Sequence, residues 1–493
     1  MGIVKRQGIK ASILVYIGFA LGAINLLVLF PVLFTEEQVG LTRVLTSTTV
    51  TFAQLCLLGL PAVIVKFYPY YKDHARENSD LMFWSSLISF VGFILVSTVC
   101  WYFYPTIIQY FSKKSPLLSD YFYLTFIGGF FMVAYTIFET YSRSNLRNIV
   151  PVFLREVGLR VFTGLLLALF AIKLINYHQF IWAFTFYFGI ACIVMIVDLG
   201  RLSLLKFHPK TTKLTHRLKG KMFAYGSFIY GGGMFGIIAD NVDTFLIAGI
   251  SGLKSTGVFT IASYISTILQ VPQRTISGIA TPIIAQSWKD KDYANIQYLY
   301  EKTSLNQLIF GITIFLGVWL NIDDLFSFLP PAYSEGKYVV LIMCFARILD
   351  LGTGINAELL TTSNMWRFSF YTQVIFIGLS IPTNYFLITK YGIVGSAFSN
   401  LIAYTAFNSI RFVFIYRKFK MQPFSINTLY VFLIGVLTYL VIAYLPLTGI
   451  RIIDIAIRGI LVILCMGIPV LKFNLSEDIV ILWHQIFKKI NLK

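Results

Sequence analysis

The chain has 493 residues, of which 57% are hydrophobic and only 13% charged, and its mean hydropathy is +0.75. Soluble domains average about 25% charged residues, so this composition excludes an ordinary water-soluble enzyme or binding domain. The net charge of +18 does not indicate nucleic-acid binding, because the basic residues are scattered over many short loops rather than gathered on one face.

Six apolar segments occupy the first 200 residues, each long enough for the roughly 20 residues that a membrane-crossing helix needs. Runs such as LLVLF and LLLALF do not alternate polar and apolar residues, so we expect α-helices rather than the strands of a barrel. The predicted spans are 11–34, 42–66, 81–103, 120–142, 152–173 and 179–200.

A basic connector, residues 201–221, follows the sixth span. It carries seven Lys and Arg residues and no Asp or Glu (RLSLLKFHPKTTKLTHRLKGK). Lys and Arg accumulate in cytoplasmic loops of membrane proteins. We therefore predict that the connector is a cytoplasmic linker between two helical lobes.

Eight further spans bring the predicted total to fourteen: 222–249, 257–287, 303–322, 337–361, 369–389, 393–415, 428–446 and 452–472. The predicted organisation is an N-lobe (1–200), the linker (201–221), a C-lobe (222–415), and the last two spans with a tail (416–493). Prolines inside spans two, eight and eleven favour kinks there, because proline removes a backbone hydrogen bond: Pro61, Pro272, Pro282 and Pro382.

Most Lys and Arg residues fall in the loops on one side of the membrane, and only Arg160, Arg274 and Arg347 are sorted into spans. The positive-inside rule then predicts cytoplasmic N- and C-termini. The longest outer loops, 104–119 and 323–336, are too short for a folded domain.

Two segments resemble each other across the predicted lobes. The first is FPVLFTEEQVGLTRVLTSTTV around Gly40, and the second is TFLIAGISGLKSTGVFTIASYI around Gly257. In each, a polar turn ends at the glycine and a new apolar helix follows. With six spans in each lobe, both lobes enter the membrane in the same sense, as in transporters with parallel repeats.

No catalytic motif is visible. The five His residues have no metal-ligand spacing, the five Cys residues lie in spans without CxxC spacing, and no GxxxxGK[ST] loop for ATP is present. We therefore expect a transporter rather than an enzyme, without a metal or another cofactor.

Charges inside the spans are the candidate functional residues, because an ionised side chain at bilayer depth costs roughly 2.5–3.5 kcal/mol unless a partner or a watery cavity receives it. Asp240 and Asp243 lie on one helical face, where they can hold a cation or share a proton; Asp243 can also be solvated at the outer interface. Arg274 either lines a cavity for an anionic group or pairs with an acid of span seven.

Four further charges allow local neutralisation. Arg347 and Asp350 are spaced i,i+3 in span ten, and Glu139 and Arg160 form a candidate pair between spans four and five. Glu358, two turns beyond Asp350, has no obvious local partner.

Three segments carry a family resemblance: QGIKASILVYIGFALGAINLLVLFPVLFTEEQVGL, DNVDTFLIAGISGLKSTGVFTIASYIS and KYGIVGSAFSN. With the fourteen spans and the break after six, the chain resembles the Wzx-type polysaccharide flippases of the multidrug/oligosaccharidyl-lipid/polysaccharide (MOP) superfamily. The resemblance implies two MATE-like six-helix lobes that open alternately to the two sides. It also implies transport of an undecaprenyl-diphosphate-linked oligosaccharide across the bacterial inner membrane, for O-antigen of lipopolysaccharide, capsule or exopolysaccharide.

The resemblance also implies roles for the charges. Arg274, Arg160 and Arg347 would meet the diphosphate or acidic sugars. Coupling to Na+ or H+ would fall to the acids Asp240, Asp243, Asp350, Glu358 and Glu139. Span one carries no charge, unlike the lipid II flippase pattern, which favours a surface polysaccharide repeat unit as substrate. The implied partners are this lipid-linked oligosaccharide, the bilayer and other polysaccharide-assembly proteins.

Two other functions stay open. A cation-coupled multidrug antiporter of the same superfamily would have a smaller and more acidic cavity, against which the three intramembrane arginines count. A membrane polysaccharide polymerase or ligase is a different class, which the short outer loops and the lack of a catalytic cluster disfavour.

Overall fold

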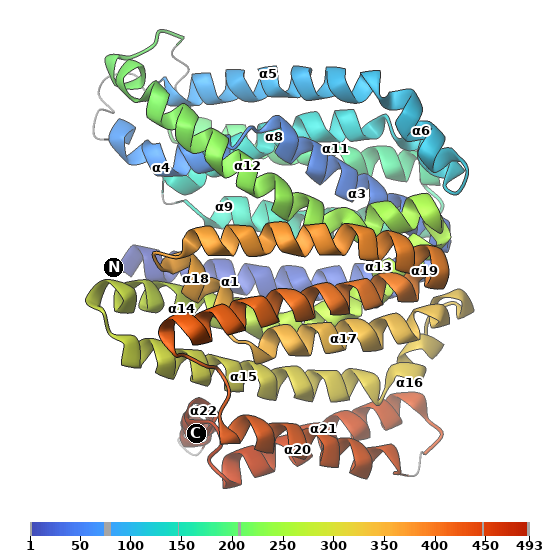
Figure 1. Ribbon diagram of the computed structural model, residues 1–493. Coiled ribbons are helices and arrows are strands. Elements are labelled where there is room, and N and C mark those ends of the chain that lie inside the picture. The colour runs from blue at the N-terminus through green and yellow to red at the C-terminus, as the bar shows by residue number, and fades with distance from the viewer. Residues whose placement is uncertain (1, 73–79, 146, 206–208, 446–447, 491–493) are drawn as a thin grey trace. The chain divides into compact units, whose positions relative to one another are not determined.

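The computed structural model describes residues 2–72, 80–145, 147–205, 209–445 and 448–490, and every regular element in these ranges is a helix (Figure 1). This confirms the predicted all-α fold. The helices form two compact units, residues Met1–Gly257 and Val258–Lys493, which are described separately below.

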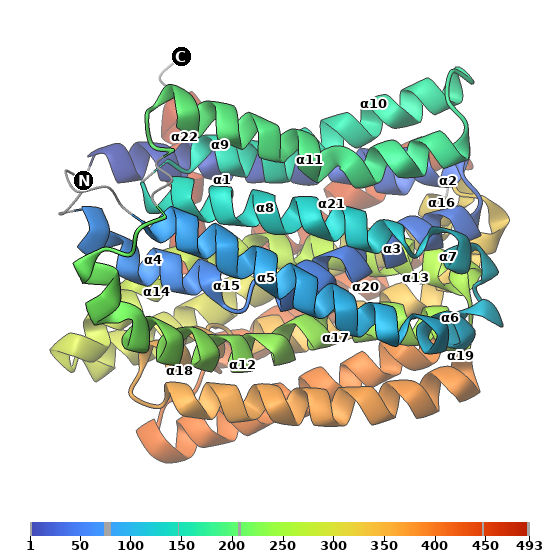
Figure 2. The same ribbon diagram turned by 90° about the horizontal axis from the view of Figure 1, so that it is seen from above.

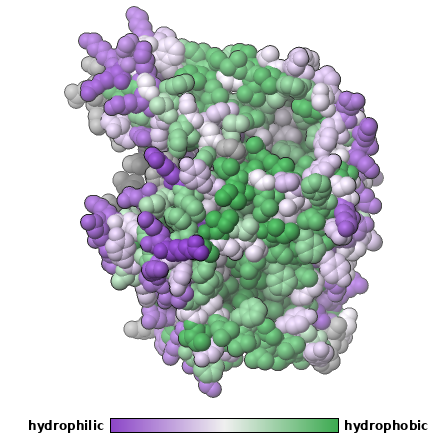
Figure 3. Space-filling view, in the orientation of Figure 1, coloured by the Kyte–Doolittle hydropathy of each residue, from purple (hydrophilic) through white to green (hydrophobic). Residues whose placement is uncertain are grey.

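The surface of both units is that of a membrane protein. Large apolar side chains stay exposed along whole helices, for example Leu95 (58%), Leu437 (61%) and Ile463 (63%). In the face shown in Figure 3, hydrophobic side chains cover the middle of the helices and hydrophilic ones gather toward the helix ends. Among the described residues, eight helices are long and apolar enough to cross a bilayer, or up to ten with two bent pairs. The protein is therefore a polytopic membrane protein, as predicted.

Unit 1 consists of consecutive helices joined by short connections. They are α1 (Gly2–Ala23), η1 (Ile24–Leu29), α2 (Phe30–Leu33), α3 (Glu36–Cys56), α4 (Leu60–Lys72), α5 (Leu81–Tyr102), α6 (Tyr104–Ser112), α7 (Pro116–Tyr121), α8 (Leu124–Ser144), α9 (Ile149–Val152), η2 (Phe153–Gly158), α10 (Leu159–Ala171), α11 (Tyr177–Arg201) and α12 (Lys213–Ile250).

Helix α8 lies at the centre of unit 1 and packs against α3, α4, α5 and α11 (Figure 2). Glycines allow this close approach, because a Cβ at Gly129 would overlap the ring of Phe52 on α3. Tyr135 of α8 is fully buried in the same core. The first span, α1 to α2, packs separately against η2 and α10.

The second predicted span is bent by 48° between α3 and α4. The bend falls at Leu58 and Gly59, which both have positive φ, and Pro61 follows in the first turn of α4. Glycine fits this turn because it has no Cβ to clash at positive φ. The prediction of a kink in span two is confirmed, with the turn two residues before the proline.

The basic connector is partly helical. Helix α11 ends at Arg201 and α12 begins at Lys213, so the second half of the predicted linker 201–221 is the first part of α12. Asp80, which is fully buried, fixes this start: its carboxylate accepts hydrogen bonds from the amide and hydroxyl of Thr212 (2.8 and 3.1 Å) and from the hydroxyl of Thr215 (2.7 Å). The buried carboxylate therefore holds Thr212, whose hydroxyl caps α12 by accepting from the amide of Thr215.

The two glycines that the sequence pairs as a repeat touch each other within unit 1. A Cβ on Gly40, in the second turn of α3, would overlap the carbonyl oxygen of Leu253, and a Cβ on Gly257 would overlap that of Glu36. Each glycine thus meets the residue four positions before the other glycine. This reciprocal contact is what two related helix starts make when a two-fold axis passes between them.

Unit 2 continues from the rest of α13 (Leu253–Thr267). Its other elements are η3 (Ile268–Gln270), α14 (Val271–Asp290), α15 (Tyr293–Trp319), α16 (Ile322–Ser327), η4 (Pro331–Gly336), α17 (Lys337–Gly352), α18 (Asn356–Thr362), α19 (Trp366–Phe419), α20 (Ile426–Ala443), α21 (Arg451–Lys472) and α22 (Glu477–Ile490). Every predicted span of both units coincides with one helix, with part of α19, or with consecutive helices.

Helix α19 is a hairpin of two helices that meet at Gly392, which has a non-helical backbone with φ +59° and ψ −139°. Thr383 bonds Ser399 near the turn, whereas Phe368 stacks on Phe414 at the other end. Residues far apart in sequence thus pair along the whole hairpin, with its two halves antiparallel. Predicted spans eleven and twelve are these two halves.

Two breaks shape the remaining helices of unit 2. Span eight is interrupted by η3 just before Pro272, whereas the first half of α19 continues as helix through Pro382. Span ten bends by 48° between α17 and α18, at Gly354 with φ +61°. No proline predicted this last bend. Helices α20 and α21 pack on α15 through apolar side chains such as Val431, Val462 and Met466.

Candidate functional site

In unit 1, Glu139 forms ion pairs with two arginines. This carboxylate on α8 is 2% exposed; Arg143 Nη2 lies 2.6 Å from its Oε1 and Arg155 Nη1 lies 3.3 Å from its Oε2. Arg143 follows at the i,i+4 position on α8, which places it over Glu139. Arg155 comes from η2, so the ion pairs also join α8 to the fifth span.

Arg160 does not pair with Glu139, and that predicted pair is wrong. Its Nη1 lies instead near the carboxylate of Glu156 (3.0 Å), the carbonyl oxygen of Glu156 (2.6 Å) and that of Arg155 (2.9 Å). A π-helical turn bonds residues i and i+5. The guanidinium thus contacts two backbone carbonyl oxygens and one carboxylate of the π-helical segment η2.

A second π-helical segment faces the first. Asn25, in η1, is buried and its side-chain amide donates to the carbonyl oxygen of Arg160 (2.7 Å). On the preceding helix, a Cβ at Gly18 would overlap the carbonyl oxygen of Glu156. The uncharged first span is therefore joined to η2 by a side-chain hydrogen bond and a close backbone contact, neither of which hydropathy reveals.

In unit 2, Asp350 at the end of α17 is the centre of a polar network. Its Oδ1 accepts a hydrogen bond from the amide of Asn408 (3.0 Å) and its Oδ2 accepts one from the amide of Gln273 (3.2 Å). Asn408 in turn accepts from the amide of Asn356 (2.8 Å) and the hydroxyl of Thr353 (3.1 Å). Helices α14, α17, α18 and α19 thus meet around one carboxylate whose partners are neutral.

Among the described contacts, Arg347 bonds Tyr404 rather than pairing with Asp350, although the i,i+3 spacing allows such a pair. Its Nη1 donates to the hydroxyl of Tyr404 (2.6 Å), and the guanidinium lies 4.8 Å from the centre of that ring. Both oxygens of Asp350 already accept hydrogen bonds from amides, and Arg347 turns toward the second half of α19.

Arg411 is a buried charged residue that sequence analysis missed. It is 5% exposed, and it donates to the hydroxyls of Thr372 and Ser369, both at 3.1 Å, while its guanidinium lies 3.8 Å from the ring centre of Phe407. The carboxylates that act on its charge are those of Asp350 and Glu358. The structure therefore brings Arg411, Asp350 and the half-buried Glu358 into one electrostatic cluster.

The remaining predicted site residues are Arg274, Asp243 and Asp240. Arg274 on α14 is exposed, and within the described ranges it makes no hydrogen bond or ion pair. Asp243 on α12 is half-buried, and the side chain of Asp240 lies outside the described residues. The predicted pairing of Arg274 with an acid of span seven would join the two units, and it stays a prediction.

The titratable side chains show no cluster for metal chemistry. Among the residues that the structure describes, no three His, Cys, Asp or Glu side chains come together as a metal site. The five cysteines are free thiols within helices. The arrangement offers two charges within predicted spans: an exposed cation at Arg274 and an acid with neutral hydrogen-bonding partners at Asp350.

Comparison with protein families matches residues 5–288 to the polysaccharide biosynthesis protein family. An uncharacterized membrane protein of Methanocaldococcus jannaschii is 20% identical over 457 residues, which cover 86% of this chain and 87% of that protein. These matches run through unit 1 and, for the archaeal protein, through most of unit 2.

Two solved structures share the fold. The lipid II flippase MurJ in an inward closed conformation has a TM-score of 0.69 at 15% identity, with 93% of this chain and 98% of that chain covered. An inward-facing multidrug resistance MATE family transporter of the MOP superfamily has a TM-score of 0.65 at 11% identity, with 83% and 94% covered. Because the family match spans more than half of the sequence, the chain belongs to the polysaccharide biosynthesis protein family.

Proposed function

We propose that this protein is a flippase that moves an undecaprenyl-diphosphate-linked oligosaccharide repeat unit across the bacterial cytoplasmic membrane by alternating access. The product would serve surface polysaccharide synthesis, as O-antigen, capsule or exopolysaccharide. Its membership of the polysaccharide biosynthesis protein family and a fold shared with a lipid II flippase support this proposal. The positive-inside pattern supports cytoplasmic N- and C-termini.

The observation that carries the proposal is an exposed cation within a predicted span. Arg274 lies within predicted span eight, and the described part of the chain offers it no carboxylate. A guanidinium stays protonated, so it requires water or an anionic ligand at that depth. A diphosphate is such a ligand, because it accepts bidentate hydrogen bonds from arginine.

The physical task of such a protein is to lower a solvation barrier. Each unsatisfied polar group of a sugar costs several kcal/mol in hydrocarbon. A hydrated path lined with polar and charged side chains avoids that cost while the polyprenyl tail stays in lipid. No bond is made or broken, so the protein needs charges at fixed places rather than a nucleophile.

Coupling to Na+ or H+ is part of the proposal, and Asp350 is its best-placed residue. The carboxylate is half-buried and bonded to two amides, so its charge has no ion-pair partner among its hydrogen-bonding neighbours. Carboxylate and amide oxygens are ligands that hard cations prefer. Glu358 lies in the same electrostatic cluster as Asp350 through Arg411.

Substitution of Arg274 tests the proposed function in cells whose surface polysaccharide depends on this protein. We expect R274Q to lower surface polysaccharide by roughly ten-fold or more, because loss of one charged contact of about 1.4 kcal/mol already costs a factor of ten. R274K keeps the charge and should retain part of the activity. Lys289, an exposed cation of the same helix, gives the control K289Q, which should be unaffected.

The amount of each variant in the membrane is measured in parallel by immunoblot. Normal polysaccharide in R274Q cells at normal protein level would overturn the role of Arg274. A cation-coupled multidrug antiporter is the second candidate, supported by the shared fold with a MATE transporter. It predicts altered drug susceptibility and unchanged polysaccharide when the protein is removed.

A further inference from the structure

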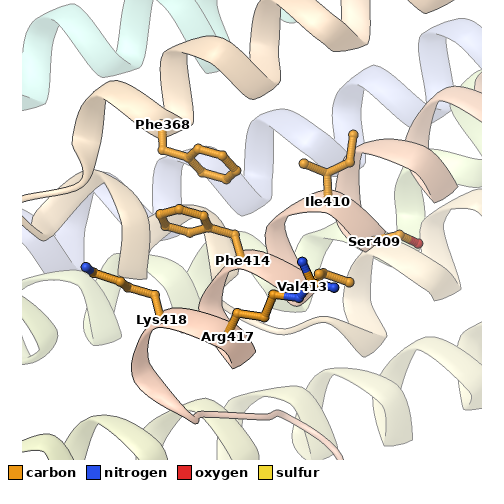
Figure 4. A pocket seen from close by; sticks show the side chains of 7 residues that line it. All are labelled: Phe368, Ser409, Ile410, Val413, Phe414, Arg417 and Lys418. Atoms are coloured by element: carbon orange, nitrogen blue, oxygen red, sulfur yellow. The ribbon is translucent and has the colours of Figure 1, made fainter.

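An open cavity of about 540 Å³ lies at the end of the α19 hairpin, where the start of its first half meets the end of its second half (Figure 4). Phe368 and Phe414 stack there with ring centres 3.7 Å apart. Ile410 and Val413 extend the apolar wall along the second half of the hairpin. The cavity lies entirely within unit 2 and is separate from the network around Asp350.

Two cations lie beside this apolar wall. Arg417 and Lys418 line the cavity, and in Figure 4 their side chains leave the helix on either side of Phe414. Both are exposed, no carboxylate lines the cavity, and in the described ranges neither cation forms an ion pair. Cations in a last helical turn are favoured by the helix dipole, so charge alone would not define a site here. The adjoining apolar wall distinguishes this place from an ordinary helix end, because cations at a helix end do not require apolar neighbours.

The combination specifies the chemistry of a ligand. Two cations next to hydrocarbon-facing side chains complement a phosphate that carries an apolar chain, since arginine binds phosphate oxygens in pairs and each cation attracts an anionic headgroup. The positive-inside pattern places this end of α19 at the cytoplasmic surface. A site with only two cations requires a ligand at high local concentration. Bilayer phospholipids are the phosphate-bearing molecules with the highest local concentration at that surface.

We propose that this cavity binds an anionic bilayer phospholipid. Its phosphate contacts Arg417 and Lys418, and one acyl chain lies along Val413, Ile410 and Phe414. Such a site makes the end of the α19 hairpin responsive to the anionic lipid content of the membrane. The proposal does not depend on which substrate the protein moves.

Native mass spectrometry of the intact protein released from nanodiscs of phosphatidylglycerol and phosphatidylethanolamine tests the site. We expect the wild-type protein to retain bound phosphatidylglycerol. The fraction of R417Q/K418Q protein with bound phosphatidylglycerol should be lower by roughly five-fold or more. The matched control K289Q/K291Q removes the same charge at the end of α14, where Trp288 meets Phe419 of α19 with ring centres 4.9 Å apart. That control should behave as wild type.

A second variant separates the lipid chain from its phosphate. V413W fills the cavity beside the apolar wall with a larger side chain and keeps both cations, so this variant should also fail to retain phosphatidylglycerol. Wild-type retention by both R417Q/K418Q and V413W would overturn the proposal. Equal competition by inorganic phosphate would reassign the cavity to a free anion, and loss of substrate transport by R417Q/K418Q in liposomes without anionic phospholipid would reassign it to the transported lipid.

Discussion

Single charged residues in the spans fall into two groups with different physical environments. Glu139 and Arg160 are satisfied by neighbours: two arginines for the first, a carboxylate and two carbonyl groups for the second. Asp350 has neutral amide partners, and Arg274 is exposed. The first group is suited to holding helices together, and the second to meeting ions or anionic ligands.

The two buried or half-buried acids should therefore differ in their effect on stability. E139Q leaves Arg143 and Arg155 without their counter-ion, and because both arginines are more than a third exposed, water screens part of the loss. We expect E139Q to lower the free energy of unfolding by about 1–2 kcal/mol. Unfolding in mixed detergent micelles measures this value.

D350N is the matched comparison for E139Q. Asparagine keeps one oxygen that accepts from Asn408 or Gln273, so the expected loss is under about 1 kcal/mol. If D350N destabilised the protein more than E139Q, Asp350 would be the structural acid and Glu139 the better candidate for ion coupling.

Sequence reasoning identified most of these charges but not their partners. Arg411 was missed because it lies near the end of predicted span twelve, where a basic side chain usually reaches the interface. Only the fold of the α19 hairpin shows that Ser369 and Thr372, about 40 residues earlier, enclose it. Partners this distant in sequence leave no local signal.

At the scale of single helices, the spans were predictable and their irregularities were not. A membrane-crossing helix can be recognised by the length of its apolar segment, and each predicted span coincides with helical structure. The π-helical segments η1 and η2 depend on contacts between spans, such as that of Asn25 with the carbonyl of Arg160, which composition cannot reveal. The bend of span ten depends on the positive φ of Gly354, and no proline in the sequence predicts it.

The glycines of α12 have a different environment from those that join helices. Among the residues that the structure describes, a Cβ on Gly231, Gly233 or Gly236 would meet no atom within 4 Å, so close helix packing does not explain these glycines. They lie in the continuous helix α12, where glycine weakens the helix relative to alanine. Glycine also lets a helix bend, so we predict that α12 bends at these residues during transport.

The reciprocal contact of Gly40 and Gly257 gives a sharp test at the level of helix packing. A methyl group at either position would overlap a backbone carbonyl oxygen of the facing segment, which side-chain motion cannot relieve. We expect G40A and G257A each to lower the free energy of unfolding by about 1–3 kcal/mol, the usual cost of overpacking.

G233A is the control for both glycine variants, because open space surrounds that Cβ. Alanine in a helix interior should there be neutral or stabilising by about 0.5–1 kcal/mol. Equal stability of G40A, G257A and G233A would show that the close contact between the two helix starts is not required for folding.

For the whole molecule, composition alone excluded a soluble protein, and the all-helical membrane fold follows from it. The predicted lobe boundary after span six stays a prediction. The structure places α12 in the first compact unit, because α12 packs on α3 and α4 and Asp80 bonds its N-cap residue, Thr212. Hydropathy reports where a helix crosses the bilayer but not which neighbours it packs against.

The central claim is that this protein carries a lipid-linked oligosaccharide between leaflets. Purified protein is reconstituted into liposomes that contain a polyprenyl-diphosphate oligosaccharide with a fluorescent sugar label, and an impermeant reductant is added outside. Wild-type protein should expose the label of both leaflets to the reductant, whereas empty liposomes and R274Q should leave the inner pool protected. Protection of the inner pool by folded wild-type protein, with and without Na+ and pH gradients, would contradict the proposed function.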